Sequence, residues 1–234
     1  IFLSADVAGF IGNGHFLRDA LHATSEVRRL QDNSYTMPEA IYIVNKVSQD
    51  LLIRPMGIFQ LMDYVGVDVM HFISKIMDKY IECEDLSDDL IDTMYDKKVV
   101  GGQRSDGSQK DGFFKYEKNR PVAVFDPDSD EYIAFNDGAW SEKLDQKIGD
   151  YPENWTPWKG LLTSSDRNGQ LKAYFDRLRQ STNLGAGLAR DYLKRSKEIG
   201  HLLVDKHVAE SADDVNGVLM NGFYHLYGPI NDYI

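Results

Sequence analysis

The amide side chain of Asn13 is one candidate for chemistry in this sequence. It ends the run Phe10-Ile11-Gly12-Asn13 close to the start of the chain. An amide donates and accepts hydrogen bonds without changing its own charge, so it can hold a reacting oxygen while that oxygen's bonding changes. Asn is also among the best N-cap residues, so a purely structural role at a helix start is the alternative interpretation.

The histidines and the single cysteine form no recognisable site. No pair of histidines has metal-binding spacing completed by a carboxylate, and no Ser–His–Asp arrangement can be assigned. We therefore expect the histidines at the surface or in helix packing: His15, His22, His71, His201, His207 and His225. Cys83 is the only cysteine, which excludes an intramolecular disulfide and a cysteine zinc site.

Two other patterns resemble ligand-binding loops only in part. Gly9, Gly12 and Gly14 are spaced G-x-x-G-x-G, the reverse of the dinucleotide fingerprint, so they predict no cofactor loop. The acidic run 126–130 resembles the start of a calcium loop, but Glu131 stands where that loop needs glycine. A hairpin turn explains this run better, and we predict neither cofactor-binding nor metal-binding residues in the chain.

Apolar residues at three- and four-residue steps predict helices through the first hundred residues. One helix is predicted from about Phe16 to Leu30. Thr36 and Glu39 form a capping box that begins a second helix, which runs to about Leu51.

A short β segment interrupts this helical pattern. Residues 101–112 are rich in Gly, Ser, Asp and Lys and predict an exposed loop. Residues 122–125 and 132–135 flank the turn at 126–130, which is a hairpin signal. Helical spacing resumes near Asp166, so the predicted fold is mainly α with a small β-hairpin insertion.

Composition is typical of a folded protein and excludes some classes of function. The 234 residues are 42% hydrophobic and 27% charged, with a net charge of −11. Such an acidic chain repels phosphate backbones, so we expect no nucleic-acid binding. No apolar run approaches the roughly 18–20 residues that span a membrane, and no signal peptide is apparent. A cytoplasmic protein is expected, and the missing initiator Met suggests a fragment or a trimmed chain.

Three segments resemble one family. Residues 54–68, R-P-M-G-I-F-Q-L-M-D-Y-V-G-V-D, resemble the G-P-F-E-L-x-D-x-V-G-L-D segment of the helical C-terminal domain of 3-hydroxyacyl-CoA dehydrogenases. Residues 6–14 are similar to the family's D-T-P-G-F-I-x-N-R segment, although Ala8 replaces Pro and Gly14 replaces Arg. Residues 101–116 loosely match its G-R-x-x-G-K-G-F-Y-x-Y ending, whose aromatics are expected to dock the loop on the helices.

The resemblance implies a role for specific residues. Asn13 matches the family Asn that hydrogen-bonds near the substrate and the catalytic His, so it is the candidate catalytic and substrate-binding residue. Met56 and Phe59 are candidates for contact with the acyl chain, although their spacing equally suits a helix–helix core. NAD and the His–Glu pair belong to an upstream Rossmann domain in this family. The chain alone is therefore expected to be inactive, with its own Rossmann domain and an acyl-CoA as partners.

The C-terminal third predicts a second, shorter copy of the first helical unit. Arg18-Asp19 corresponds to Arg190-Asp191, and the capping box at 36–39 corresponds to 211–214. A fixed period is the mark of repeated units. The predicted division is a first helical domain at 1–116, a hairpin and linker at 117–165, and a second repeat at 166–234. Two copies would form an internal pseudo-dimer, or the chain would form a homodimer.

The function implied by the resemblance is oxidation of 3-hydroxyacyl-CoA to 3-ketoacyl-CoA with NAD in fatty-acid β-oxidation. This chain would supply the substrate cleft and the dimerisation surface. One alternative is a non-catalytic helical scaffold derived from the same fold. Another is a 2-hydroxyacid or sugar-acid dehydrogenase, but the catalytic Lys expected there is absent from residues 1–44.

Overall fold

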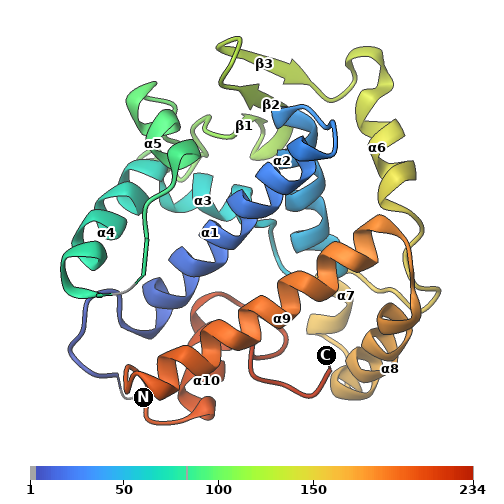
Figure 1. Cartoon of the computed structure of the whole chain (residues 1–234). Coiled ribbons are helices and arrows are strands. Elements are labelled where there is room, and N and C mark those ends of the chain that lie inside the picture. The colour runs from blue at the N-terminus through green and yellow to red at the C-terminus, as the bar shows by residue number, and fades with distance from the viewer. Residues whose placement is uncertain (1–3, 83, 234) are drawn as a thin grey trace. The chain divides into compact units, whose positions relative to one another are not determined.

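The computed structural model describes residues 4–82 and 84–233, which form a mainly helical chain with one small antiparallel sheet (Figure 1). The helices are α1 (Phe10–Asp32), α2 (Met37–Lys46), η1 (Val47–Leu51), α3 (Ile58–Val65), α4 (Val67–Tyr80), α5 (Asp89–Asp96), η2 (Asp137–Ala139), α6 (Trp140–Ile148), α7 (Trp158–Leu162), α8 (Arg167–Gln180), α9 (Leu184–Asp205) and α10 (Ala212–Gly222). The strands are β1 (Phe114–Glu117), β2 (Arg120–Asp126) and β3 (Glu131–Ala134). The predicted mainly α class with a small hairpin is confirmed, while Cys83 lies outside the described residues.

The chain divides into two compact units, each built from separated segments. Unit 1 contains the described residues of 1–19, 46–57 and 146–234, and unit 2 contains those of 20–45 and 58–145. The predicted division at 116 and 165 follows a proposed duplication, which compactness does not test, so that division and the tandem repeat stay predictions.

Unit 1 is held together by buried tyrosines as well as by apolar side chains. The Tyr174 hydroxyl on α8 donates to the carbonyl of Leu51 at 2.8 Å. The Tyr227 hydroxyl near the C-terminus donates to the carbonyl of Leu52 at 2.7 Å. Both carbonyls lie at the end of η1, where helical acceptors lose their intrahelical partners. The two tyrosine hydroxyls therefore supply hydrogen-bond donors to the carbonyl groups at the end of η1.

The capping box and the end of the second predicted helix show what sequence pattern does and does not specify. Thr36 N–H donates to the Glu39 carboxylate at 2.8 Å, and Glu39 N–H donates to the Thr36 hydroxyl at 3.4 Å, which confirms the predicted box. The last turn before Leu51 is a π-helix rather than an α-helix. The Arg54 N–H donates to the Gln49 carbonyl at 2.8 Å, five residues back.

Unit 2 contains the sheet, with strand order β1-β2-β3 and antiparallel pairing throughout (Figure 1). The predicted hairpin is β2–β3, and the predicted turn is fixed by Asp126, whose carboxylate accepts from Asp128 N–H and the Ser129 hydroxyl. Strand β1 was not predicted from the sequence. It contains the last aromatic residues of the segment that resembles the family ending.

Asp88 joins two helices within unit 2. Its carboxylate caps α5 by accepting from the N–H groups of Leu90 and Ile91 at 3.0 and 3.3 Å. The other oxygen accepts from the Thr24 hydroxyl at 2.7 Å and from the Arg28 guanidinium at 2.6 Å, both on α1. One buried carboxylate thus starts α5 and ties it to α1.

Replacing Asp88 by Ala is expected to lower the free energy of unfolding by about 2 kcal/mol. The cap contributes roughly 1 kcal/mol and the buried Thr24 hydroxyl loses its carboxylate partner, while the Arg28 pair counts for less because its side chain is half exposed. Urea unfolding followed by circular dichroism measures the change. The neighbouring Asp89→Ala, at an exposed position in the same turn, is the matched control. Equal losses in the two variants would contradict the assignment.

No helix among the described residues is both long enough and apolar enough to cross a membrane.

Candidate functional site

The start of α1 presents Asn13 to solvent. The helix begins at Phe10, six residues earlier than predicted, because its apolar face continues to the buried Ile11. Asn13 therefore lies within the helix and is not its N-cap, which corrects the structural alternative. Its side chain is exposed and has no hydrogen-bond partner within residues 4–82 and 84–233. The amide is free to bind a group from outside this chain.

The first turn of α1 has an unusual backbone. Gly9 has φ of 89° and Phe10 has φ of 47°, although a non-glycine residue seldom adopts positive φ. The Gly14 N–H donates to the Gly9 carbonyl at 3.0 Å, five residues back. Such a conformation persists only where the surrounding structure holds it, and it is found most often at functional sites.

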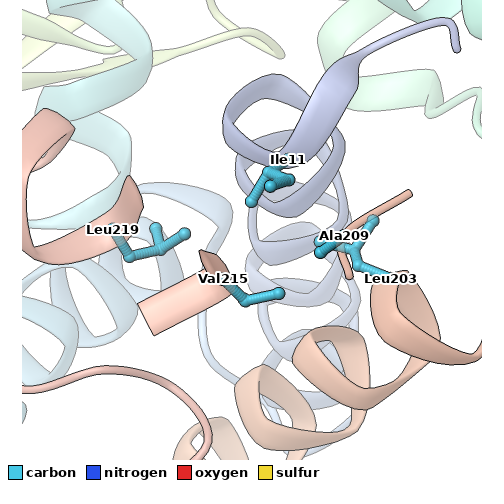
Figure 2. Close-up of a cluster of buried hydrophobic side chains, with 5 residues drawn as sticks. All are labelled: Ile11, Leu203, Ala209, Val215 and Leu219. Carbon is cyan, nitrogen blue, oxygen red and sulfur yellow. The ribbon is translucent and has the colours of Figure 1, made fainter. Parts of the chain in front are cut away.

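A buried apolar cluster in unit 1 supplies part of that support. Figure 2 shows Ile11 of α1 facing side chains from the end of α9, the following loop and α10. The buried members are Ile11, Leu203, Ala209, Val215 and Leu219. A Cβ on Gly12 would lie 3.5 Å from the Phe223 ring, so the helix also packs closely at the residue before Asn13. This cluster fixes the start of α1 against α9 and α10.

Arg18 contacts the same turn from within the helix. It is only 6% exposed, and its Nη1 donates to the carbonyl of Gly14 at 2.8 Å. Gly14 follows Asn13 directly. Asn13 therefore lies between a residue anchored by apolar packing and one held by a buried guanidinium.

One turn further along α1, Asp19 enters a buried ion pair. Arg54 Nη1 lies 3.0 Å from Asp19 Oδ2, and both residues are at most 8% exposed. The Arg54 guanidinium lies 5.1 Å from the centre of the Tyr192 ring, a cation–π contact, and the Tyr192 hydroxyl donates to the Asp19 carbonyl at 3.0 Å. Three separated segments of unit 1 meet in this arrangement.

His15 lies beside this pair and is fully buried. Its Nε2 lies 3.2 Å from the Ser196 carbonyl and 3.3 Å from the Ser196 hydroxyl. Its Nδ1 and Asp19 Oδ1 are 4.0 Å apart, and within the described chain neither atom has a hydrogen-bond partner. Burial lowers the pKa of His15 below 6.5, and the charges of Arg54 and Arg18 lower it further, while Asp19 and the Ser196 carbonyl oppose them. The imidazole is therefore neutral at pH 7.

His225 belongs to the same group of charges. Burial lowers its pKa well below 6.5, and the nearby Arg54 and His15 add to the effect. His15 lies in the interior, where its ring contacts Ser196 of α9 and lies near Asp19 of its own helix.

A second buried carboxylate, Asp63, organises unit 2. It accepts from the N–H groups of Phe113 and Phe114 at 2.6 and 2.9 Å and from the Tyr116 hydroxyl at 2.9 Å. A Cβ on Gly112 would lie 2.2 Å from Asp63 Oδ1, so only glycine allows this approach. Burial raises the pKa of Asp63 to about 7, against the lowering effect of the three hydrogen bonds. The segment expected to dock on the helices does so through this residue.

The three predicted site residues do not come together within one unit. Asn13 and the partly buried Met56 belong to unit 1, and Phe59 belongs to unit 2. Phe59 is 0% exposed and packs against the Phe113 ring, with centroids 4.9 Å apart. This is the core-packing role that the sequence left open, and contact with an acyl chain stays a prediction.

Sequence reasoning missed the buried pair of Asp19 and Arg54. The available signal was the placement of Arg18 and Asp19 between Leu17 and Ala20, inside the apolar stripe of α1. Charged residues in such a stripe must be paired when they are buried. Their partner at position 54 and the Tyr192 contact had no sequence signal, because they depend on the packing of distant segments.

Comparison with known proteins gives one result. Residues 9–116, just under half of the chain, match the family model described as 3-hydroxyacyl-CoA dehydrogenase, C-terminal domain. No curated protein and no solved structure gave a significant match. The matched range contains Asn13, Met56, Phe59 and Asp63 and ends within β1.

Proposed function

Residues 9–116 are a C-terminal domain of the 3-hydroxyacyl-CoA dehydrogenase family, and on this premise we propose that the chain forms the substrate cleft of such an enzyme. The whole enzyme would oxidise 3-hydroxyacyl-CoA to 3-ketoacyl-CoA with NAD in fatty-acid metabolism. Asn13 would bind the reacting oxygen, and the partly buried Met56 of the same unit would contact the acyl chain.

The observation that carries this proposal is the state of Asn13. Its amide is exposed, without a partner among the described residues, and attached to a helix start that is anchored on both sides. Such preorganisation is what a group needs if it is to bind a reacting oxygen without reorganising during the reaction. A solvated surface amide would need neither the positive φ at Phe10 nor the buried anchors.

The chemistry of hydride transfer would have to come from outside these residues. The sheet that the described residues form is antiparallel, and Gly9 leads directly into α1 without a parallel βαβ crossover. That arrangement does not fit a dinucleotide. His15 is buried beside Arg54, so it is no accessible general base either. We therefore propose that NAD and the catalytic base belong to an upstream Rossmann domain and that the chain alone is inactive.

The partners and setting follow from the same proposal. The chain would pack against its own Rossmann domain and bind an acyl-CoA in a cytoplasmic enzyme. The repeat predicted between residues 1–116 and 166–234 would make it an internal pseudo-dimer, with a homodimer as the alternative.

Asn13→Ala and Asn13→Asp are each expected to lower activity at least about tenfold, equivalent to about 1.4 kcal/mol of transition-state binding. The assay is acetoacetyl-CoA-dependent oxidation of NADH by the full-length protein, with circular dichroism to confirm folding. Asn168→Ala, at an exposed amide in α8, is the control.

The other outcomes separate the alternatives. Activity that survives both substitutions would keep the enzyme and remove Asn13 from the site. An inactive wild-type protein would favour a scaffold derived from this fold. The sheet beyond residue 116 lies outside the family match and is the feature that favours that alternative.

A further inference from the structure

We propose that Arg18 is a positioning residue that fixes the orientation of Asn13, an inference that rests on the proposed role of Asn13. Arg18 does not touch the exposed amide. It acts on the carbonyl of Gly14, the residue that follows Asn13, through a 2.8 Å hydrogen bond from Nη1.

The placement of Arg18 is unusual for a helical arginine. Its side chain is almost fully buried and turns back along α1 onto the carbonyl four residues earlier. A hydrogen bond from a charged donor is roughly twice as strong as one between neutral groups. A Cβ on Gly14 would lie 3.5 Å from Nη1 and 3.4 Å from Leu203 Cδ2, so the guanidinium and Leu203 surround this glycine closely.

The turn that Arg18 holds is one that needs support. Phe10 has positive φ, and the Gly14 N–H donates to the Gly9 carbonyl, five residues back. Ile11 secures the turn on the side that faces α9 and α10 (Figure 2). Arg18 secures it at Gly14, so the backbone of Asn13 is fixed from both neighbouring positions while its side chain stays exposed.

Loss of the guanidinium would release Gly14 without exposing the apolar anchor. The first turn would then be free to relax toward an ordinary α-helix, which would rotate the Asn13 amide away from its present direction. Because Asn13 is proposed to bind the reacting oxygen more tightly in the transition state, the rate constant should fall more than substrate binding.

The test compares Arg18→Met and Arg18→Lys with Arg190→Met. Arg190 is a matched control because its Nη1 also donates to backbone carbonyls in unit 1, those of Leu178 and Ser181, away from α1. The first measurement uses this chain itself, labelled with ¹⁵N. We expect Arg18→Met to speed hydrogen exchange at the Gly14 amide at least about tenfold and to shift the Asn13 side-chain amide signals. Arg18→Lys should have a smaller effect, and Arg190→Met should change neither signal.

The second measurement uses the full-length enzyme. Arg18→Met should lower kcat about tenfold with KM changed less than about twofold, and adding it to Asn13→Ala should cause little further loss. Unchanged exchange at Gly14, or multiplicative losses in the double variant, would overturn the role of Arg18. If Asn13→Ala leaves activity intact, the proposed function of Asn13 fails, whereas the exchange measurement still decides whether Arg18 holds the turn.

Discussion

Replacing Asp63 by Ala is expected to destabilise the chain by at least about 3 kcal/mol, because three donors lose their acceptor at once. Two of them are the N–H groups of Phe113 and Phe114, both buried, and the third is the Tyr116 hydroxyl. No other acceptor replaces a fully buried carboxylate when it is truncated. The free energy of unfolding from urea titration measures the loss.

Because the pKa of Asp63 is raised, the size of this destabilisation depends on pH. Its folded-state value of about 7 lies above the ordinary 3.8, so the carboxyl favours the folded chain most below pH 4 and loses that contribution as the pH rises to about 7. The variant lacks this dependence. The difference in stability between wild type and Asp63→Ala should therefore be larger at pH 5.5 than at pH 8.

Two controls isolate the contribution of the carboxylate. Tyr116→Phe removes one donor and should cost about 1 kcal/mol. Asp78→Asn changes an exposed carboxylate on α4 and should cost less than about 0.5 kcal/mol. A loss below about 1 kcal/mol for Asp63→Ala would show that the 113–116 segment is held by its aromatic rings instead.

The elements that sequence predicts correctly are those specified by neighbouring residues. The capping box at Thr36 forms because both partners lie within one turn, and the hairpin forms because its turn residues act on their own backbone. The π-helix at Val47–Leu51 has no such local signal. Its end is completed by Tyr174 and Tyr227, which come from distant parts of the chain.

The candidate site also has some features that the sequence predicts and others that depend on distant packing. The exposed position of Asn13 follows from its place between the buried Ile11 and the buried stripe of α1, so its availability could be predicted. The positive φ of Phe10 and the return of Arg18 to Gly14 could not, because they depend on packing against α9 and α10. Strand β1 was missed for a related reason, since its pairing with β2 passes over a bulge between Lys115 and Tyr116.

Acidification from pH 7 to pH 5 is expected to destabilise unit 1 through His15 and His225. Both have folded-state pKa values below the ordinary 6.5, so between pH 6.5 and pH 5 the unfolded chain binds more protons than the folded chain. Their contribution to stability is complete above about pH 6.5 and is lost as the pH falls below it. Each histidine adds a slope of at most about 1.4 kcal/mol per pH unit.

His15 and His225 should both contribute to this slope, because burial lowers the pKa of each. His15 is 0% exposed and lies among Arg54, Arg18 and Asp19. Protonation would place another positive charge beside the buried Arg54 and Arg18, and the 4.0 Å separation from Asp19 is too long for a hydrogen bond to offset it. The surrounding groups therefore set the direction of the shift, and Asp19 alone does not reverse it.

Substitution separates this effect from the opposite pH dependence of Asp63. His15→Gln should flatten the fall in unfolding free energy between pH 6.5 and pH 5 by up to about 2 kcal/mol, although it lowers stability at pH 7. His201→Gln, at an exposed position of α9, should leave the slope unchanged. A slope as steep in His15→Gln as in the wild type would show that His225, whose pKa is also lowered, carries the pH dependence, and would contradict the assignment to His15.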